Sequence, residues 1–482
     1  MEYDPKKVLC SCARVTCGDV AEAVKNGAKT LGDVRETTRA AAFCGSCADR
    51  VEAFVGQVLS GEAVPAAEAP APEAAPADLP YALTREVCGD LIYVGASDHR
   101  ITLFENQYPT PDGMSYNSYV LLDKQTVLFD TADQAVSEVF LRNVEAALNG
   151  RKLDYVVVHH MEPDHGATLR AVLQKWPEAQ VICTAGAKKI IGQFFGAAAA
   201  ARVQEVRDGV SVMTGAHILS FHTAPMVHWP EVMVTYDRTS ETLFSADAFG
   251  TFGALNGNLF ADMGDFPLSE YRRYYSNIVG KFGPQVQAAL NKLAALKISR
   301  ICPLHGPVIR QNLTGILEKY RLWSAYAPEE KGVVIACASV YGHTANACFA
   351  LADALSERGV RDVRLFDVSK THSSYILSEV FRRSHLVLAS VTYVGGVFPA
   401  MESLIAELKN HGLKNRTVAL LENGCWAPVS GKRMTELLSG APITLLEQKV
   451  TLLSAMNESH RPALEALADA LAAGIADGTD GR

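Results

Sequence analysis

The spacing of apolar and polar positions predicts strands that alternate with helices over most of the chain. Apolar runs at residues 119–122 and 126–129 have the length and composition of buried strands. A helical pattern follows at 136–148, and another strand-like run, at 153–158, ends directly before a cluster of polar side chains. This alternation is typical of a mixed α/β domain.

A second α/β pattern begins near residue 332. Residues 332–338 are almost wholly apolar, as expected for a strand that is buried on both faces of a parallel sheet. A polar loop at 339–344 follows, and we expect a helix at 345–358 that ends at Gly359.

The N-terminal region carries a different pattern. Thr16 with Asp19 and Thr30 with Asp33 have the spacing of capping boxes, so each pair predicts the start of a short helix. Residues 61–80 contain five prolines, eight alanines, four acidic residues and no basic residue. Such a segment cannot bury enough apolar area to fold, and it predicts an extended linker.

These patterns predict a multidomain α/β protein. We expect a small helical domain at residues 1–60, the linker at 61–80, one α/β domain at 81–330 and a second at 331–482. The length of 482 residues supports several domains, because single cores stop growing near about 250 to 300 residues.

Charge and composition exclude some classes of function. A net charge of −8 with no basic run argues against nucleic acid as a partner. The first residues lack the apolar segment of a signal peptide, and no apolar run reaches about 18 residues, so we expect a cytoplasmic protein with no membrane partner. In a reducing compartment the eleven cysteines are expected to be thiols, metal ligands or redox groups.

A run of metal-binding residue types follows the apolar segment 153–158. Residues 160–165 read H-x-E-x-D-H and contain His160, Glu162, Asp164 and His165. Burying two carboxylates and two imidazoles there would cost several kcal/mol without a compensating cation. The run therefore predicts a metal centre.

Three further donors lie at the ends of later apolar runs: His228, Asp247 and His305. A single histidine or aspartate in such a place is usually structural. Together with the first cluster, however, they make a set of seven possible ligands in loops that a rigid scaffold would support.

Four cysteines near the N-terminus form a second candidate site. Cys10 and Cys12 make a C-x-C pair, and Cys44 and Cys47 make a C-x-x-C pair. Four thiolates can bind zinc or a 2Fe-2S cluster. Residues 8–58 resemble the bacterioferritin-associated ferredoxin family, and the resemblance implies 2Fe-2S. Cys17 falls outside the pattern and is interpreted as a bystander thiol.

The donor set in the middle region resembles the metallo-β-lactamase fold and, within it, the flavodiiron proteins. Zinc hydrolases of this fold have histidine where this chain has Glu162, and a carboxylate there suits iron better. The resemblance implies a non-haem diiron site. One iron would take His160, Glu162 and His228, the other would take Asp164, His165 and His305, and Asp247 would bridge them. His159 and Asp130 are interpreted as structural.

The C-terminal α/β pattern resembles flavodoxin, which implies a doubly wound sheet that binds FMN. The loops expected around FMN follow three strands, where such sheets bind their ligands. The loop at 422–426 departs from related diiron proteins, which are richer in glycine there. The residues implied to bind FMN are Ser339, Val340, Tyr341, Gly342, His343, Thr344, Thr392, Tyr393, Val394, Gly395, Gly396, Asn423, Gly424, Cys425 and Trp426.

The domain order resembles the flavodiiron core, an αββα metallo-β-lactamase-like domain followed by a flavodoxin-like one. It implies an oxidoreductase that reduces O2 to water, NO to N2O, or both, with electrons passing from 2Fe-2S to FMN to the diiron site. The ligand set does not choose between the gases. It also implies an external electron donor, which could be a reductase, a rubredoxin or a ferredoxin, and a head-to-tail homodimer or a dimer of dimers.

Two other classes of function stay open at this point. One is a zinc hydrolase of the metallo-β-lactamase fold with an accessory flavodoxin-like domain, which Glu162 disfavours. The other is an iron-handling or docking protein, because relatives of the N-terminal region bind bacterioferritin.

Overall fold

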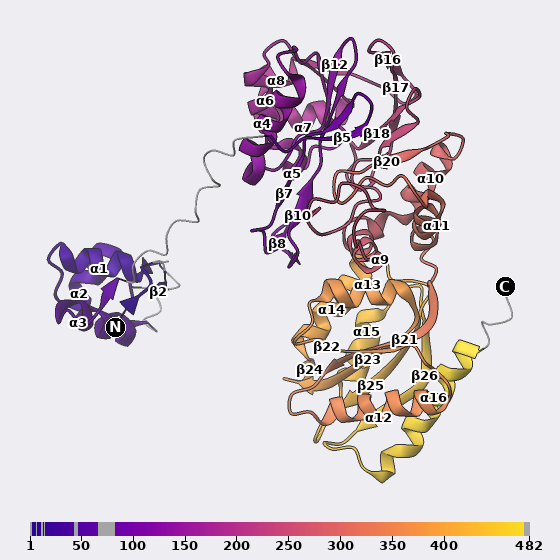
Figure 1. Ribbon diagram of the computed structural model, residues 1–482. Coiled ribbons are helices and arrows are strands. Elements are labelled where there is room, and N and C mark those ends of the chain that lie inside the picture. The colour runs from indigo at the N-terminus through magenta and orange to yellow at the C-terminus, as the bar shows by residue number, and fades with distance from the viewer. Residues whose placement is uncertain are drawn as a thin grey trace. The chain divides into compact units, whose positions relative to one another are not determined.

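The computed structural model describes residues 2–5, 7–10, 13, 15–42, 47–65 and 82–476. The chain divides into two compact units, Met1–Tyr81 and Ala82–Arg482 (Figure 1). Among the residues so described, no helix combines the length and the apolar character needed to cross a bilayer.

The first unit is built from three short helices, α1 (Cys17–Lys25), α2 (Leu31–Thr38) and α3 (Ala48–Leu59). Each contributes a fully buried valine to one core, namely Val20, Val34 and Val51. Both predicted capping boxes are present: the Thr16 and Thr30 side chains accept hydrogen bonds from the backbone N–H groups of Asp19 and Asp33. Local sequence therefore sets where these helices begin.

Two small strand pairs complete this unit. Strand β2 (Val8–Cys10) pairs with β3 (Val15–Thr16), and β1 (Glu2–Tyr3) pairs with β4 (Val64–Pro65). The first residues of the expected linker thus pair with the N-terminal strand, whereas residues 66–80 lie outside the described residues.

The second unit begins with two sheets. The first has the order β15 (Val203–Glu205), β14 (Gln180–Cys183), β13 (Tyr155–Val157), β12 (Thr126–Phe129), β11 (Tyr119–Leu122), β6 (Leu91–Tyr93) and β5 (Arg85–Cys88). The second has the order β16 (Ser211–Met213), β17 (Ile218–Thr223), β18 (Met233–Asp237), β19 (Thr242–Phe244) and β20 (Arg300–Cys302). Phe129 and Phe244 stack with ring centroids 3.8 Å apart, which joins the two sheets through their apolar faces.

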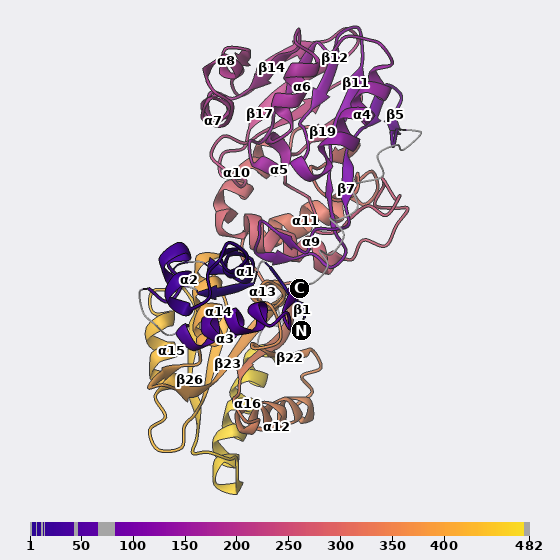
Figure 2. The same ribbon diagram turned by 90° about the vertical axis from the view of Figure 1, so that its left-hand side faces the viewer.

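Helices surround this pair of sheets (Figure 1, Figure 2). They are α4 (Ser137–Leu148), α5 (Pro163–Gly166), α6 (Leu169–Lys175), α7 (Ala185–Phe195), α8 (Ala197–Ala200), α9 (Leu268–Tyr274), α10 (Gly283–Leu293) and α11 (Leu313–Ser324). Two short strand pairs lie between β6 and β11 in the chain. They are β7 (Ala96–Asp98) with β10 (Met114–Tyr116) and β8 (Leu103–Phe104) with β9 (Tyr108–Pro109). The result is the expected αββα arrangement.

The C-terminal part is a parallel sheet in the order β22 (Val363–Asp367), β21 (Glu330–Ala338), β23 (Arg383–Tyr393), β25 (Thr417–Asn423) and β26 (Thr444–Leu452). The short β24 (Gly396–Val397) pairs with β23. This order is the flavodoxin-like doubly wound order.

Alternate residues of β21 enter two different cores. Val333 and Ile335 pack with α12 (His343–Glu357) and α16 (Arg461–Ala476), whereas Val334 and Ala336 face the core that includes α13 (Ser373–Arg382), α14 (Pro399–Asn410) and α15 (Ser430–Leu438). A strand buried on both faces must be apolar throughout, which is the pattern found in the sequence.

Helix α12 begins two residues earlier than the sequence pattern predicts. Gly342 is its N-cap, with φ of 91°, a left-handed conformation that glycine adopts without a steric penalty. His343 is therefore the first residue of the helix.

Candidate metal centre and flavin pocket

The seven candidate ligands all come from segments that directly follow strands. Those at 160–165 follow β13, His228 lies between β17 and β18, Asp247 follows β19, and His305 follows β20. The structure collects them into two neighbouring groups, one of His160, Glu162, His228 and Asp247 and one of Asp164, His165 and His305.

The first group converges on one carboxylate oxygen of Asp247. The Nε2 atoms of His160 and His228 each lie 3.1 Å from Glu162 Oε2. The same two nitrogen atoms each lie 3.3 Å from Asp247 Oδ2. Donor atoms this close together surround a position suited to one cation.

The second group faces the other oxygen of Asp247. Asp164 Oδ2 lies 3.2 Å from His165 Nε2 and 3.1 Å from His305 Nε2. Asp247 Oδ1 lies 3.2 Å from His165 Nε2 and 3.5 Å from His305 Nε2. One carboxylate therefore presents one oxygen to each group, which is the geometry of a bridging ligand.

Several donor atoms in this cluster are buried and lack hydrogen-bond partners in the described part of the chain. They are both carboxylate oxygens of Asp164, Asp247 Oδ2 and His305 Nε2. Leaving buried polar atoms unpaired costs about 1–3 kcal/mol each, and more for charged groups. Two metal ions would satisfy these atoms, so the residues present fit a two-metal centre.

The pKa values in the cluster show how strongly its groups interact. Burial alone would lower the pKa of His228, but the neighbouring carboxylates of Asp247 and Glu162 raise that pKa to about 9. Burial would raise the pKa of Glu162, but hydrogen bonds to His160 and His228 lower it to about 2. Protons on the imidazoles thus balance the carboxylates, and a metal ion would displace such protons.

The outward nitrogens of two of the histidines are held by partners that the sequence did not reveal. His160 Nδ1 lies 2.8 Å from Glu231 Oε1, and His305 Nδ1 lies 2.6 Å from the Ser115 carbonyl oxygen. Each bond directs the Nε2 lone pair of its ring into the cluster.

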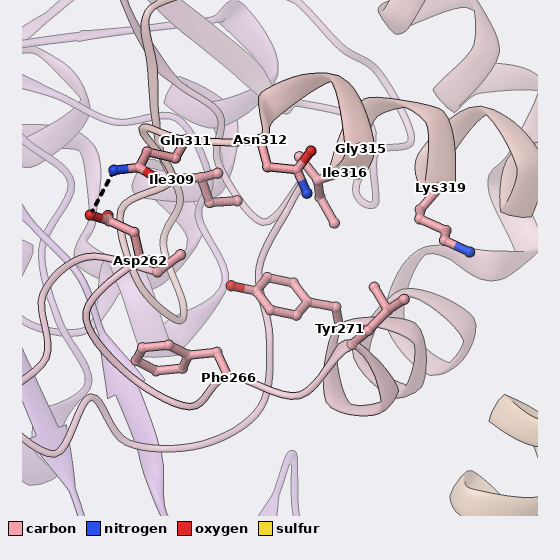
Figure 3. A pocket seen from close by; sticks show the side chains of 11 residues that line it. Asp262, Phe266, Tyr271, Ile309, Gln311, Asn312, Gly315, Ile316 and Lys319 are labelled. Carbon is pink, nitrogen blue, oxygen red and sulfur yellow. Dashed lines mark hydrogen bonds between the residues drawn. The ribbon is translucent and has the colours of Figure 1, made fainter.

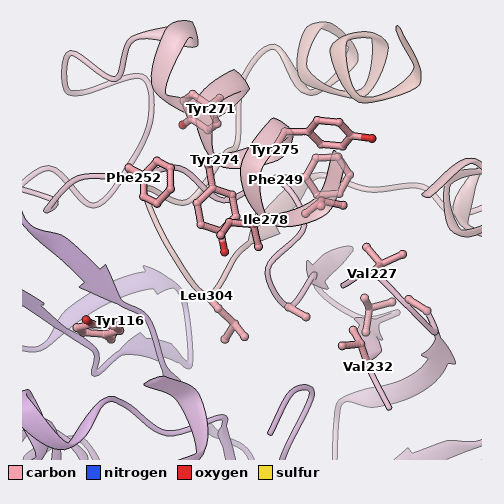
Figure 4. Close-up of a cluster of buried hydrophobic side chains, with 14 of the residues drawn as sticks. Tyr116, Val227, Val232, Phe249, Phe252, Tyr271, Tyr274, Tyr275, Ile278 and Leu304 are labelled. Carbon is pink, nitrogen blue, oxygen red and sulfur yellow. The ribbon is translucent and has the colours of Figure 1, made fainter. Parts of the chain in front are cut away.

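Aromatic and aliphatic side chains surround the second group. The Tyr274 side chain reaches from α9 into a buried cluster that includes Phe252, Ile278 and Leu304 (Figure 4). Its hydroxyl donates a 3.1 Å hydrogen bond to Asp247 Oδ1. This shell limits the access of water to the cluster, so the electrostatic interactions inside it are strengthened.

The loops that we expect around FMN line a separate cavity of about 710 Å³ at the carboxyl edge of the C-terminal sheet. Gly342 and Gly396 are absent from its lining, whereas Val391, Ala427, Val429 and Ser454 are additional members. The other implied residues line it: Ser339, Val340, Tyr341, His343, Thr344, Thr392, Tyr393, Val394, Gly395, Asn423, Gly424, Cys425 and Trp426. Its size, apolar walls and position before α12 fit a flavin mononucleotide, whose phosphate suits a helix N-terminus.

Hydrogen bonds order the loops of this cavity. The backbone N–H of Gly342 donates to Ser339 Oγ over 3.1 Å, and Asn423 Nδ2 donates to Thr344 Oγ1 over 3.2 Å. Tyr341, Val394 and Trp426 are each about nine-tenths exposed, at 90%, 91% and 91%. Such exposed apolar side chains are available to contact a flat ring or another protein surface.

The structure describes two of the four cysteines expected to bind the 2Fe-2S cluster. Cys10 and Cys47 are both buried, and burial together with a hydrogen bond to Cys10 raises the pKa of Cys47. Cys12 and Cys44 lie outside the described residues. Cys17 is buried at the start of α1.

Comparison with known proteins agrees with the resemblances of the N-terminal region and of the region that contains the candidate ligands. Residues 8–57 match the family described as "BFD-like [2Fe-2S] binding domain", and residues 114–306 match "ODP family beta lactamase". The chain is 30% identical over 356 residues to the anaerobic nitric oxide reductase flavorubredoxin of Vibrio vulnificus, a match that covers 71% of this chain and 70% of the relative. The chain belongs to the flavodiiron protein family.

Solved structures agree with this assignment. The rubredoxin oxygen:oxidoreductase from Desulfovibrio gigas is 26% identical, with a TM-score of 0.77 over 82% of this chain and 99% of that one. The flavodiiron protein from Giardia intestinalis shares the fold, with 23% identity and a TM-score of 0.76 over 82% of this chain and 98% of that one. The flavodiiron chain described here is an oxidoreductase.

His159 lies next to the ligand cluster of this flavodiiron protein but faces away from it. Its ring contacts Asp130 through Nδ1 and lies 2.7 Å from Thr235 Oγ1 through Nε2. The predicted structural role of His159 is confirmed, and Asp130 is its partner.

A further open pocket, of about 380 Å³, lies between α9, α11 and the segment around residue 262 (Figure 3). Phe266, Tyr271, Asn312 and Lys319 are among its lining residues. It contains none of the candidate ligands of the flavodiiron site, so we do not assign it to the reaction.

Proposed function

We propose that this chain reduces nitric oxide or dioxygen at a non-haem diiron centre. In this proposal His160, Glu162 and His228 hold one iron, Asp164, His165 and His305 hold the other, and Asp247 bridges the two. When bound, the two irons and FMN supply the electrons that reduce the gas.

The observation that carries the proposal is the division of the Asp247 carboxylate between the two groups. A zinc hydrolase also uses a two-metal cluster in this fold, but Glu162 replaces a nitrogen donor with a harder oxygen donor. Oxygen donors favour iron over zinc, and the flavin cavity supplies a reason for electrons to be delivered.

We propose that electrons enter through a 2Fe-2S cluster on Cys10, Cys12, Cys44 and Cys47 and pass through FMN in the 710 Å³ cavity. A one-electron centre in the N-terminal unit would refill the flavin stepwise. An external reductase, rubredoxin or ferredoxin would supply that centre.

We also propose that the protein works as a homodimer in which the partner subunit covers the flavin cavity. The nearly full exposure of Tyr341, Val394 and Trp426 supports this, because large apolar side chains grouped on one rim mark contact surfaces.

The proposed function is tested by metal analysis and by gas consumption on the same preparation. We expect iron in excess of zinc, bound FMN, and consumption of NO or O2 by the anaerobically reduced full chain. Assays with each gas in parallel would show which one is preferred. Zinc in the cluster together with no gas consumption would contradict the proposal.

The electron route is tested by a matched pair of cysteine variants. Cys47→Ser removes a proposed cluster ligand, and Cys17→Ser changes another buried cysteine of the same core that we do not assign to the cluster. We expect Cys47→Ser to lose turnover with a physiological donor while keeping turnover with dithionite as reductant. Cys17→Ser should keep both. Equal donor-driven turnover in the two variants would contradict the route.

A further inference from the structure

Glu231 is a buried carboxylate that contacts the candidate ligand His160. It lies in the loop between β17 and β18 that also carries His228, and its exposed fraction is 4%. Its Oε1 lies 2.8 Å from His160 Nδ1 and accepts a 3.1 Å hydrogen bond from the backbone N–H of Met161. Because a carboxylate only accepts, Nδ1 carries the proton and Nε2 presents its lone pair to the cluster.

A glycine lies where any side chain would meet the Cα and Cβ atoms of Glu231. A Cβ atom at Gly186, in the first turn of α7, would lie 2.9 Å from Glu231 Cβ and 3.3 Å from its Cα. The Thr184 hydroxyl, at the N-cap of α7, donates a 2.9 Å hydrogen bond to the Glu231 carbonyl oxygen. The N-terminal end of α7 therefore lies against Glu231.

Among the described residues, no carboxylate contacts the Nδ1 atoms of His165 and His305 in the second group. His305 Nδ1 contacts the Ser115 carbonyl oxygen at 2.6 Å, which carries no net charge. His165 Nδ1 has no hydrogen-bond partner among the residues that the structure covers. The two proposed metal positions thus differ in charge: a carboxylate contacts the Nδ1 atom of a histidine ligand only in the first group, among the described residues.

We infer that Glu231 is a positioning residue that makes the two metals of the centre inequivalent. Its negative charge increases the electron donation of His160 and stabilises the oxidised form of the metal in the first position. The metal held by His160, Glu162 and His228 is therefore oxidised more readily than the metal held by Asp164, His165 and His305. This inference rests on the proposed diiron function.

The test compares Glu231→Gln and Glu231→Ala with the wild-type full chain. Glu231→Gln keeps an acceptor for His160 but removes the charge, whereas Glu231→Ala removes both. Asp237→Asn is the matched control, because Asp237 is also buried and lies 2.7 Å from a histidine nitrogen, that of His217, outside both ligand groups.

Two measurements report on the variants. The first is the Fe(II) affinity of each position, measured anaerobically by calorimetry on metal-free protein. The second is the potential range over which the mixed-valent EPR signal appears in a redox titration. We expect Glu231→Ala to weaken one of the two binding steps by about 10- to 100-fold. We expect Glu231→Gln to bind both ions and to shift one midpoint potential upward.

Different results would count against the role of Glu231 and against the proposed diiron function. Wild-type-like potentials in a fully loaded Glu231→Gln protein would overturn the inference and leave the diiron proposal intact. Equal shifts in Asp237→Asn would also overturn it. A wild-type chain that binds no iron at these residues would overturn both.

Discussion

At the scale of single residues, the acid–base state of the proposed ligands would determine how the cluster binds metal. In the metal-free chain the pKa of His228 is raised to about 9, so this imidazole is protonated at neutral pH. The protonated form stabilises the fold fully below its ordinary pKa of about 6.5, and that contribution is lost as the pH rises through about 9. A metal needs the neutral imidazole, so metal binding must release the proton.

We therefore predict that Fe(II) affinity rises with pH between about 6 and 9, by about tenfold per pH unit for each proton displaced. Anaerobic calorimetry in buffers of different ionisation enthalpy measures the number of protons released at pH 7. At least one proton should be released for each chain loaded. Binding without proton release would contradict the protonated state assigned to His228.

The structure brings the seven predicted donors together, whereas the residues that contact them from behind were not predicted. All seven donors lie in segments that follow strands, so their position at one edge of the fold follows from local patterns. Glu231 lies 71 residues from His160 in the chain, and Tyr274 lies 27 residues from Asp247. Such contacts depend on how the sheets and helices pack, and no local pattern in a single sequence encodes them.

At the scale of elements, α7 shows how one helix supports the site from a distance. Gly186→Ala would place a methyl group against Glu231, and we predict that it lowers the free energy of unfolding by about 1–3 kcal/mol. It should also weaken Fe(II) binding in the first position, because Glu231 must move.

The matched control lies in the same helix. A Cβ atom at Gly192 would meet only Ala200 Cβ, at 3.6 Å, which is an ordinary contact. Gly192→Ala should therefore be neutral or stabilising, by up to about 1 kcal/mol, with unchanged metal affinity. Denaturant unfolding of both variants measures the difference, and equal effects would show that contact with Glu231 is not the cause.

The bounds of some strands agree with the sequence prediction, and those of others do not. Strands β11 and β12 have the predicted bounds, whereas β13 is shorter than the apolar run 153–158. Ser454, in the segment after β26, also lines the expected flavin cavity. It was not predicted, because the prediction used only the loops after three of the strands. Loops that lie together at one edge of a sheet are far apart in the chain. The strand order must therefore be known before all of them can be identified.

At the scale of the whole molecule, we propose that three regions form one electron route. The resemblance of the domain order to the flavodiiron core already implied this route, and the comparisons show the family. The fold adds two sites with the volume and donors to hold the cofactors, a flavin cavity of about 710 Å³ and a two-part ligand cluster.

A single-turnover measurement tests most directly whether the chain reduces NO or O2 at a diiron centre. The fully reduced full chain is mixed anaerobically with NO, or with O2, and the oxidation of FMN and iron is followed by stopped-flow absorbance and rapid-freeze Mössbauer spectroscopy. Asp247→Asn, which removes the bridging carboxylate, and Asp237→Asn, which changes a buried carboxylate outside the cluster, are measured beside it.

We predict that the proposed diiron centre and FMN of the wild type and of Asp237→Asn are oxidised within one turnover by at least one of the gases. Asp247→Asn should be slowed by at least about 100-fold, because loss of a ligand shared by both metals disrupts the whole centre. Flavin that stays reduced in the wild type, or oxidation at equal rates in all three proteins, would contradict the account.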